Sequence, residues 1–132
     1  MTANHLADLR TIIDHLDSCG RLTRVTTEVD PKFDLAGIAA HFESTPRAVL
    51  FEKVKGYDVP VFTGLYWSRE LLAQLMAQEE ATLPGFVSGC IQNWQKQPVP
   101  PVMVDHGPIL DGGPHPLDLS TLPIPIHAIK DG

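Results

Sequence analysis

The chain has 132 residues, of which 43% are hydrophobic and 20% are charged, and its formal net charge at pH 7 is −6. This length and composition are typical of one soluble globular domain, and no stretch approaches the roughly 20 consecutive apolar residues that a membrane helix needs. The negative charge and the dispersal of the Lys and Arg residues argue against a nucleic-acid surface, which needs clustered cations.

The first predicted helix carries apolar residues at helical spacing from Leu6 to Cys19. Asn4 is its expected N-cap, and Gly20 occupies the position where a left-handed C-terminal residue belongs. Apolar and polar residues then alternate over residues 22–29, which predicts a half-buried strand.

The Asp30-Pro31 pair should break this strand, and a second helix with apolar positions between residues 35 and 42 is expected to end near Pro46. The runs 48–54 and 59–65 are rich in strand-forming residues and are separated by a short turn. They predict an antiparallel hairpin, with Gly56 in the turn.

Ser68 is expected to cap a third helix, and a fourth helix should end at Pro98. The apolar stripe of the third consists of Leu71, Leu72, Leu75 and Met76, and that of the fourth of Phe86, Cys90, Ile91 and Trp94. Cys19 and Cys90 are far apart, and the N-terminus carries no signal for secretion. We therefore expect two buried free thiols in a cytoplasmic protein.

The character of the chain changes at Pro98, since eight of its twelve prolines lie from there onward. We expect no helix in this region, a short strand at residues 102–104 and an extended connector elsewhere. Residues 122–126 should be a nearly straight strand or polyproline segment. A self-sufficient domain rarely finishes this way, so we expect the chain to be the front part of a larger protein.

The predicted fold class is α/β (α+β): a small mixed sheet with a β-hairpin, flanked by about four helices. Residues 1–97 would form the domain, and residues 98–132 a strand and a proline-rich connector toward a domain that this chain lacks.

Potential metal ligands cluster only near the C-terminus, where the histidines are His106, His115 and His127 and the aspartates are Asp105, Asp111 and Asp118. Their irregular spacing fits no short ligand pattern, so we favour solvated polar residues on a connector over a metal site. The acids Glu28, Asp30, Glu79 and Glu80 lie at element ends, where solvated carboxylates are the ordinary finding. No phosphate-binding loop or nucleophile motif is present, and the residues alone assign no catalytic, cofactor-binding or metal-binding residue.

Four blocks carry a more specific signal. They are Asp8-Leu9-Arg10 with Gly20-Arg21-Leu22 and Glu28-Val29-Asp30-Pro31; residues 50–61, from Leu50-Phe51-Glu52 to Val59-Pro60-Val61; Ser68-Arg69-Glu70; and Asp118-Leu119 with Leu122-Pro123-Ile124-Pro125-Ile126-His127. In this order they resemble the N-terminal region of the UbiD-like decarboxylase family. The similarity spans nearly all of this chain and about the first quarter of the family's usual length.

The resemblance implies an enzyme that reversibly decarboxylates aromatic or α,β-unsaturated acids with prenylated flavin mononucleotide (FMN), and with Mn²⁺ and K⁺ at the phosphate of the cofactor. It places the family's catalytic glutamate, arginine and glutamate, and its asparagine, histidine and glutamate metal ligands, in a split β-barrel domain after this region. No catalytic, cofactor-binding or metal-binding residue then falls on this chain. Its partners would be the remaining domains of a homo-oligomeric enzyme, and its role would be scaffold and cleft wall.

A stand-alone, non-catalytic interaction module or short subunit is the alternative interpretation. Such a protein would dock through the proline-rich apolar tail, with residues 117–126 as an added strand or groove-binding segment. Metal binding by His106, His115 and His127 is a third hypothesis, which zinc and manganese titrations would test.

Overall fold

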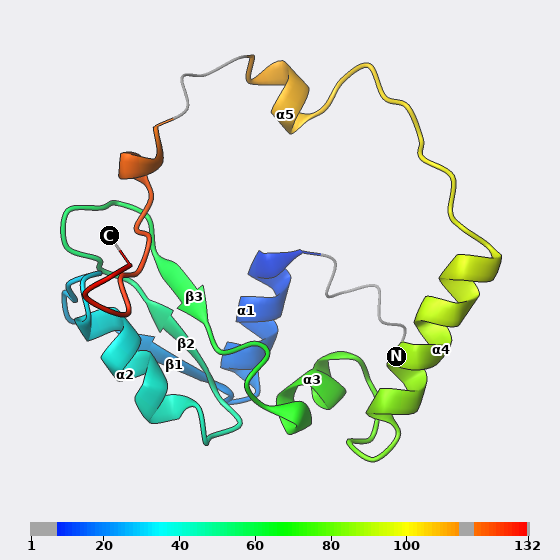
Figure 1. Ribbon diagram of the computed structural model, residues 1–132, viewed down its shortest axis with the longest axis horizontal. Helices are drawn as coiled ribbons and strands as arrows, with labels where there is room; N and C mark the ends of the chain where they lie inside the picture. Colours follow the sequence, from blue (N-terminus) through cyan, green and yellow to red (C-terminus); the bar gives the residue numbers. More distant parts are fainter. Residues whose placement is uncertain (1–7, 114–117, 132) are drawn as a thin grey trace.

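The computed structural model describes residues 8–113 and 118–131, and its centre is a three-stranded sheet in the order β1-β2-β3 (Figure 1). The strands β1 and β2 are parallel, and β2 and β3 are antiparallel, so the predicted mixed sheet with a hairpin is confirmed. The elements are α1 (Leu9–Ser18), β1 (Leu22–Val25), α2 (Asp34–Phe42), β2 (Ala48–Phe51), β3 (Val61–Thr63), α3 (Arg69–Leu75), α4 (Leu83–Lys96), α5 (Pro108–Asp111) and η2 (Leu119–Thr121).

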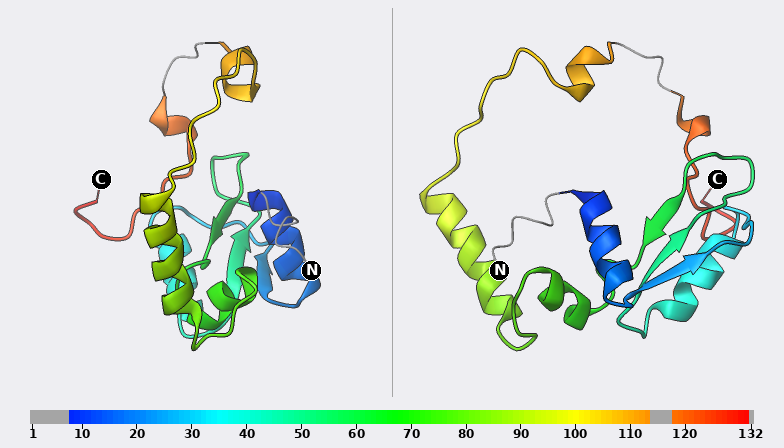
Figure 2. Two further views of the ribbon diagram at one scale, coloured as in Figure 1. Left: turned by 90° about the vertical axis from the view of Figure 1, so that its right-hand side faces the viewer. Right: turned by 180° about the vertical axis from the view of Figure 1, so that it is seen from behind.

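The central strand β2 is buried on both faces, because alternate residues of a strand point to opposite sides of its sheet. Val49 and Phe51 pack in a cluster with Leu35 of α2. Ala48 and Leu50 pack in a second cluster, which includes residues of α1 and α3. The sheet is therefore covered by α2 on one face and by α1 and α3 on the other, and α2 forms the crossover between the parallel strands (Figure 2).

The helix α1 begins later than the sequence predicts. Its N-cap is Asp8, whose carboxylate accepts a hydrogen bond from the Thr11 N–H at 2.9 Å, while Thr11 Oγ1 accepts one from the Asp8 N–H at 3.3 Å. This reciprocal pair of bonds is a capping box. The prediction of Asn4 as N-cap was wrong, and Asn4 lies outside the described residues. Gly20 has a φ of +67°, as its predicted left-handed role requires.

The predicted strand over residues 22–29 is only partly formed, because β1 ends at Val25 and Val29 makes an isolated parallel bridge to Val54. The hairpin turn is as expected, with Gly56 at a φ of +83°. Such a conformation suits glycine, which has no Cβ.

The segment after Pro98 differs most from expectation. Residues 102–104 form no strand, since a strand needs a neighbour for its hydrogen bonds and none pairs with them in the described residues. The helical turns α5 and η2 contradict the expectation of no helix, and Pro108 begins α5 at a position that proline tolerates. Residues 122–126 are bent by an Ile124 N–H bond to the Leu122 carbonyl at 2.8 Å.

The tail returns to the domain near the start of α2. The Ile126 N–H donates to the Pro31 carbonyl, and the Phe33 N–H donates to the Ile126 carbonyl, both at 3.0 Å. These bonds form a parallel bridge between Lys32 and Ile126. Residues 97–113 thus lead away from the domain, and residues 118–126 return to it (Figure 1).

Both cysteines are free, as predicted, but both are exposed, so the prediction of buried thiols was wrong. Cys90 is exposed because α4 points away from the two clusters after its first residue, Leu83, which is buried. None of the helices in residues 8–113 and 118–131 combines the length and the apolar character that crossing a membrane requires.

Candidate functional site

Those potential metal ligands near the C-terminus that the structure describes do not converge. His106 Nδ1 lies 3.6 Å from Asp111 Oδ1. Asp118 instead caps η2, since its Oδ1 accepts bonds from the Ser120 N–H at 2.9 Å and the Ser120 hydroxyl at 2.6 Å. These bonds, the hydroxyl first, lower the pKa of Asp118. His115 lies outside the described residues, which contain no group of three His, Cys, Asp or Glu side chains able to hold a metal ion.

The carboxylate of Asp30 has a structural partner. Its Oδ1 accepts a bond from the Lys32 N–H at 2.9 Å, and its Oδ2 lies 3.0 Å from Lys55 Nζ. The Lys32 bond first, and then Lys55, lowers the pKa of Asp30, which favours a permanent anion over a proton donor. Glu28, Glu79 and Glu80 are exposed, as expected for solvated acids.

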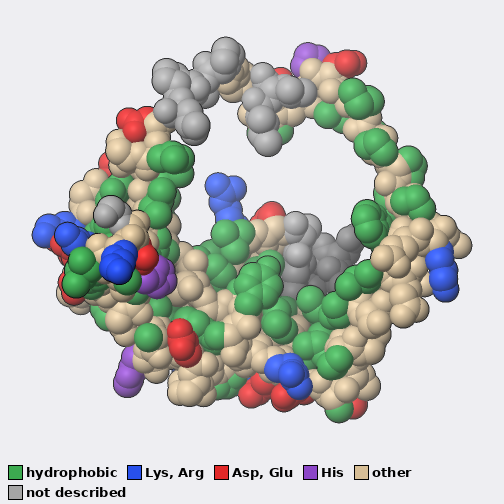
Figure 3. Space-filling model, in the orientation of Figure 1, with side chains coloured by type: hydrophobic (Ala, Val, Ile, Leu, Met, Phe, Trp, Pro, Cys, Tyr) green, Lys and Arg blue, Asp and Glu red, His purple; other side chains and the backbone are tan. Residues whose placement is uncertain are grey.

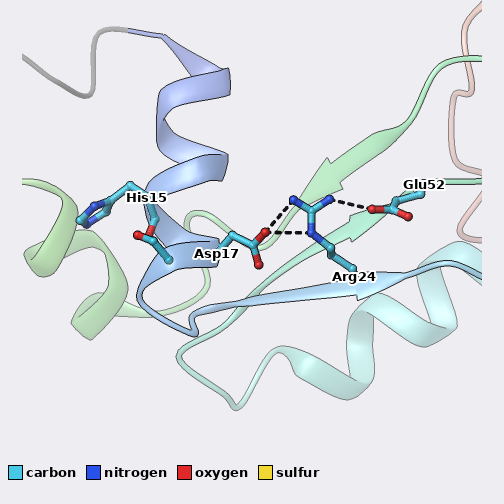
Figure 4. A network of polar contacts seen from close by, with 5 residues as sticks. His15, Asp17, Arg24 and Glu52 are labelled. Carbon is cyan, nitrogen blue, oxygen red and sulfur yellow. Dashed lines mark hydrogen bonds and ion pairs between the residues drawn. The ribbon is translucent and has the colours of Figure 1, made fainter.

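Arg24 joins α1 to the sheet (Figure 4). Its guanidinium donates to Asp17 Oδ2 through Nε at 2.9 Å and Nη2 at 2.7 Å, and to Glu52 Oε1 through Nη1 at 2.7 Å. The bond to Asp17, followed by that to Glu52, raises the pKa of Arg24. Arg21 pairs with Glu70 at 2.6 Å in the same manner, which connects the start of β1 to α3. Arg21, Arg24 and Lys55 are therefore engaged with carboxylates of this domain.

An apolar cleft lies between α1 and the segment that follows β3. Its volume is about 620 Å³, and its lining comprises Leu9, Phe62, Thr63, Gly64, Leu65, Tyr66 and Trp67. Trp67 is held in place because its Nε1–H donates to the Arg47 carbonyl at 2.9 Å. Tyr66 is 80% exposed at the rim. Among the residues that the structure describes, no carboxylate, imidazole or cationic side chain lines this cleft. It therefore suits an apolar or aromatic surface, and its described lining offers no general acid or base apart from the Tyr66 phenol.

A second cleft of about 570 Å³ lies between β1 and the start of α2. Glu28 and Asp34 are among its lining residues. Two carboxylates would repel an anionic acid, so this cleft is a poor site for a carboxylate substrate.

Sequence reasoning missed two features. Gly64 has a φ of +94°, and a Cβ at this position would overlap the indole ring of Trp67. His15 and Cys19 lie one turn apart on α1, with Cys19 Sγ 3.8 Å from His15 Nε2. Their separation of four residues could have revealed this pair, whereas nothing local indicates that Gly64 approaches an aromatic ring.

Comparison with known proteins places these features in a family. Residues 13–87 match the model of the 3-octaprenyl-4-hydroxybenzoate carboxy-lyase N-terminal domain (UbiD_N). Among curated proteins, the chain is 59% identical over 127 residues to an uncharacterized protein in the cooM 5' region of Rhodospirillum rubrum, covering 96% of this chain and 27% of the relative. It is 35% identical over 102 residues to the phenolic acid decarboxylase of Sedimentibacter hydroxybenzoicus, covering 74% of this chain and 21% of the relative. The chain thus spans about a quarter of the length of these relatives.

Solved structures give the same result. An evolved dimeric form of the UbiD-class enzyme HmfF from Pelotomaculum thermopropionicum, in complex with prFMN, is 36% identical with a TM-score of 0.72. The match covers 91% of this chain and 28% of that one. The open form of the Sedimentibacter hydroxybenzoicus vanillic acid decarboxylase, with truncated ShVdcD, is 33% identical with a TM-score of 0.59, over 74% of this chain and 21% of that one.

Proposed function

Since this chain belongs to the 3-octaprenyl-4-hydroxybenzoate carboxy-lyase (UbiD) family, we propose that it is the N-terminal domain of a decarboxylase acting on aromatic or α,β-unsaturated acids. The observation that carries the proposal is the match of residues 13–87 to the family's N-terminal domain. The likeness to HmfF and to the vanillic acid decarboxylase supports the same chemistry.

The domain's contribution is that of a scaffold and cleft wall rather than a catalytic centre. Helices pack on both faces of its sheet and provide a rigid body. The exposed carboxylates that the structure describes have no arrangement suited to proton transfer. Movement of this body against the rest of the enzyme would open and close the active-site cleft. The domain comprises residues 1–97, and residues 98–132 connect it to the rest of the enzyme.

Prenylated FMN is the proposed cofactor of the whole enzyme, with Mn²⁺ and K⁺ at its phosphate. When bound, it serves as the electron sink for carbon dioxide loss. We assign none of this chain's residues to it, because five clefts formed by the described residues each have at most one Lys or Arg in their lining. A phosphate needs free cations or a cluster of backbone N–H groups, whereas Arg21, Arg24 and Lys55 are engaged with carboxylates.

A decarboxylation assay tests the proposal. The intact protein, produced in the presence of prenylated FMN, is incubated with vanillic acid, with cinnamic acid and with 3-phenylpropanoic acid, the saturated analogue of cinnamic acid. We expect carbon dioxide release from at least one of the first two and none from the saturated acid. An intact protein that binds the cofactor but turns over no aromatic or unsaturated acid would refute the proposal.

An interaction module docking through its apolar tail remains the competing candidate. The bridge between Ile126 and Lys32 favours a tail used within the domain over one offered to a partner. If a polypeptide lacking residues 117–132 loses a specific, stoichiometric complex, the module gains support.

A further inference from the structure

The exposed apolar stripe of α4 is the feature that the proposed function leaves unexplained. It begins at Leu83, which is buried at the junction with the domain, and then leaves the domain. Phe86 is 40% exposed, Ile91 52% and Trp94 62%. At 100° per residue, these side chains share one face of the helix, so a continuous apolar surface extends over its last three turns.

The arm that follows α4 continues this surface. Residues 97–104 contain no charged residue, and the arm's large apolar side chains, Val99, Val102, Met103 and Val104, are between 60% and 91% exposed. Figure 3 shows apolar side chains following the arc of α4 and the arm around an open space.

Such a surface is unfavourable in water. Burying one large apolar side chain is worth roughly 1.5–3 kcal/mol, and soluble monomers rarely leave contiguous apolar surface of this extent uncovered. A helix of 14 residues that contains Gly85 and Gly89 is also marginal without tertiary packing. A folded body must therefore cover α4 and the arm.

The charge of α4 and the length of the matching HmfF chain indicate which body covers this surface. Lys96 is the one charged residue in α4, so the covering surface must be apolar rather than acidic or basic. The HmfF match covers 91% of this chain, and the residues that it leaves out are fewer than the 14 residues of α4. At least part of α4 therefore lies within the fold that the two proteins share. The matching segment is 28% of the HmfF chain. Most of that polypeptide therefore lies outside the match and can pack against the apolar surface.

We propose that α4 and residues 97–104 form the face on which an apolar surface of the remaining decarboxylase domains, in the same polypeptide, is docked. This inference rests on the proposed function and names the contact that holds the N-terminal domain to the rest of the enzyme. Ile91 and Trp94 lie at its centre.

Cys90 reports on this contact, because it lies in the stripe and is exposed in the structure. The intact decarboxylase is treated with a maleimide, and peptide mass spectrometry follows the labelling of Cys90 and Cys19. We expect Cys90 to react at least ten-fold more slowly than after unfolding in urea. The double variant Ile91→Asp, Trp94→Asp should restore most of the lost reactivity, and Gln92→Asp on the opposite face of α4 should not.

Equal labelling of Cys90 in the native and the unfolded enzyme would overturn the inference, whatever the activity. Protection that disappears on dilution would also overturn it, because that result assigns the face to a second copy of the chain. Carbon dioxide release, measured on the same samples, tests the proposed function separately. Protection of Cys90 in a protein without decarboxylase activity would uphold the docking face and reject the function.

Discussion

Replacement of Gly64, even by the small residue alanine, should strongly destabilise the fold. An alanine there would have to adopt a φ of +94° and place its Cβ against the indole of Trp67, which is fixed by its bond to the Arg47 carbonyl. We expect Gly64→Ala to lower the free energy of unfolding by roughly 2 to 4 kcal/mol, from backbone strain and overpacking together. Urea unfolding measures the change.

Gly37→Ala is the matched control. Gly37 lies within α2, and a Cβ there meets no atom within 4 Å. Alanine favours a helix over glycine by about 0.5–1 kcal/mol, so this variant should be neutral or slightly more stable. Equal destabilisation by the two variants would contradict our account of Gly64.

Asp30 should make folding depend on pH in the acid range. Its pKa is lowered in the folded state by the Lys32 N–H and by Lys55, so its contribution to stability is complete above the unfolded-state pKa. That contribution is lost as the pH falls through the lower, folded-state pKa. We therefore expect Asp30→Asn to reduce the loss of stability between pH 6 and pH 3, measured by urea unfolding at each pH.

Asp14→Asn provides the comparison, because Asp14 is exposed on α1 and makes no hydrogen bond or ion pair among the described residues. Its acid dependence should match that of the unmodified protein. If the two variants behave alike, the Asp30 contacts have no effect on folding.

At the scale of single elements, the cap of α3 can be tested directly. The Ser68 hydroxyl accepts a hydrogen bond from the Leu71 N–H at 3.2 Å, and Leu71 is fully buried. Loss of an N-cap costs about 1 kcal/mol, so Ser68→Ala should lower the free energy of unfolding by that amount, whereas Ser68→Asp should retain most of the stability. Ser88→Ala, on exposed α4, is expected to change little. A stable Ser68→Ala variant would show that the cap is dispensable.

The helices α2, α3 and α4 could be predicted from sequence because hydrophobic period and stop signals coincide there. Burial could not be predicted for α4, since periodicity identifies an apolar face but not what covers it. The same difficulty explains the wrong prediction for Cys90. Residues 102–104 have strand-forming side chains, yet a strand also needs a paired neighbour, which local sequence does not reveal.

The candidate site could be predicted only in part. The irregular spacing of His106, His115 and His127 argues against a metal site, and this stays a prediction because His115 lies outside the described residues. The apolar cleft beside Trp67 escaped prediction, because it depends on the packing of α1 against the segment after β3. Sequence motifs identified the family, whereas pockets arise from contacts between distant segments.

At the scale of the whole molecule, an α/β body carries α4 and residues 97–113, which lead away from it, and the chain returns to the body at Ile126. Leu83 anchors the start of α4, the Ile126 bridge anchors the tail, and Val99, Val102, Met103 and Val104 are exposed to water. These properties fit a domain that completes its packing against other domains of one enzyme.

The mass of the protein in its source cells tests this account most directly. Since the chain covers 27% of the Rhodospirillum rubrum relative, we expect an intact mass of nearly four times the 14.5 kDa of this chain. Native mass spectrometry should show that polypeptide carrying a flavin. A mass of 14.5 kDa without a flavin would contradict the account.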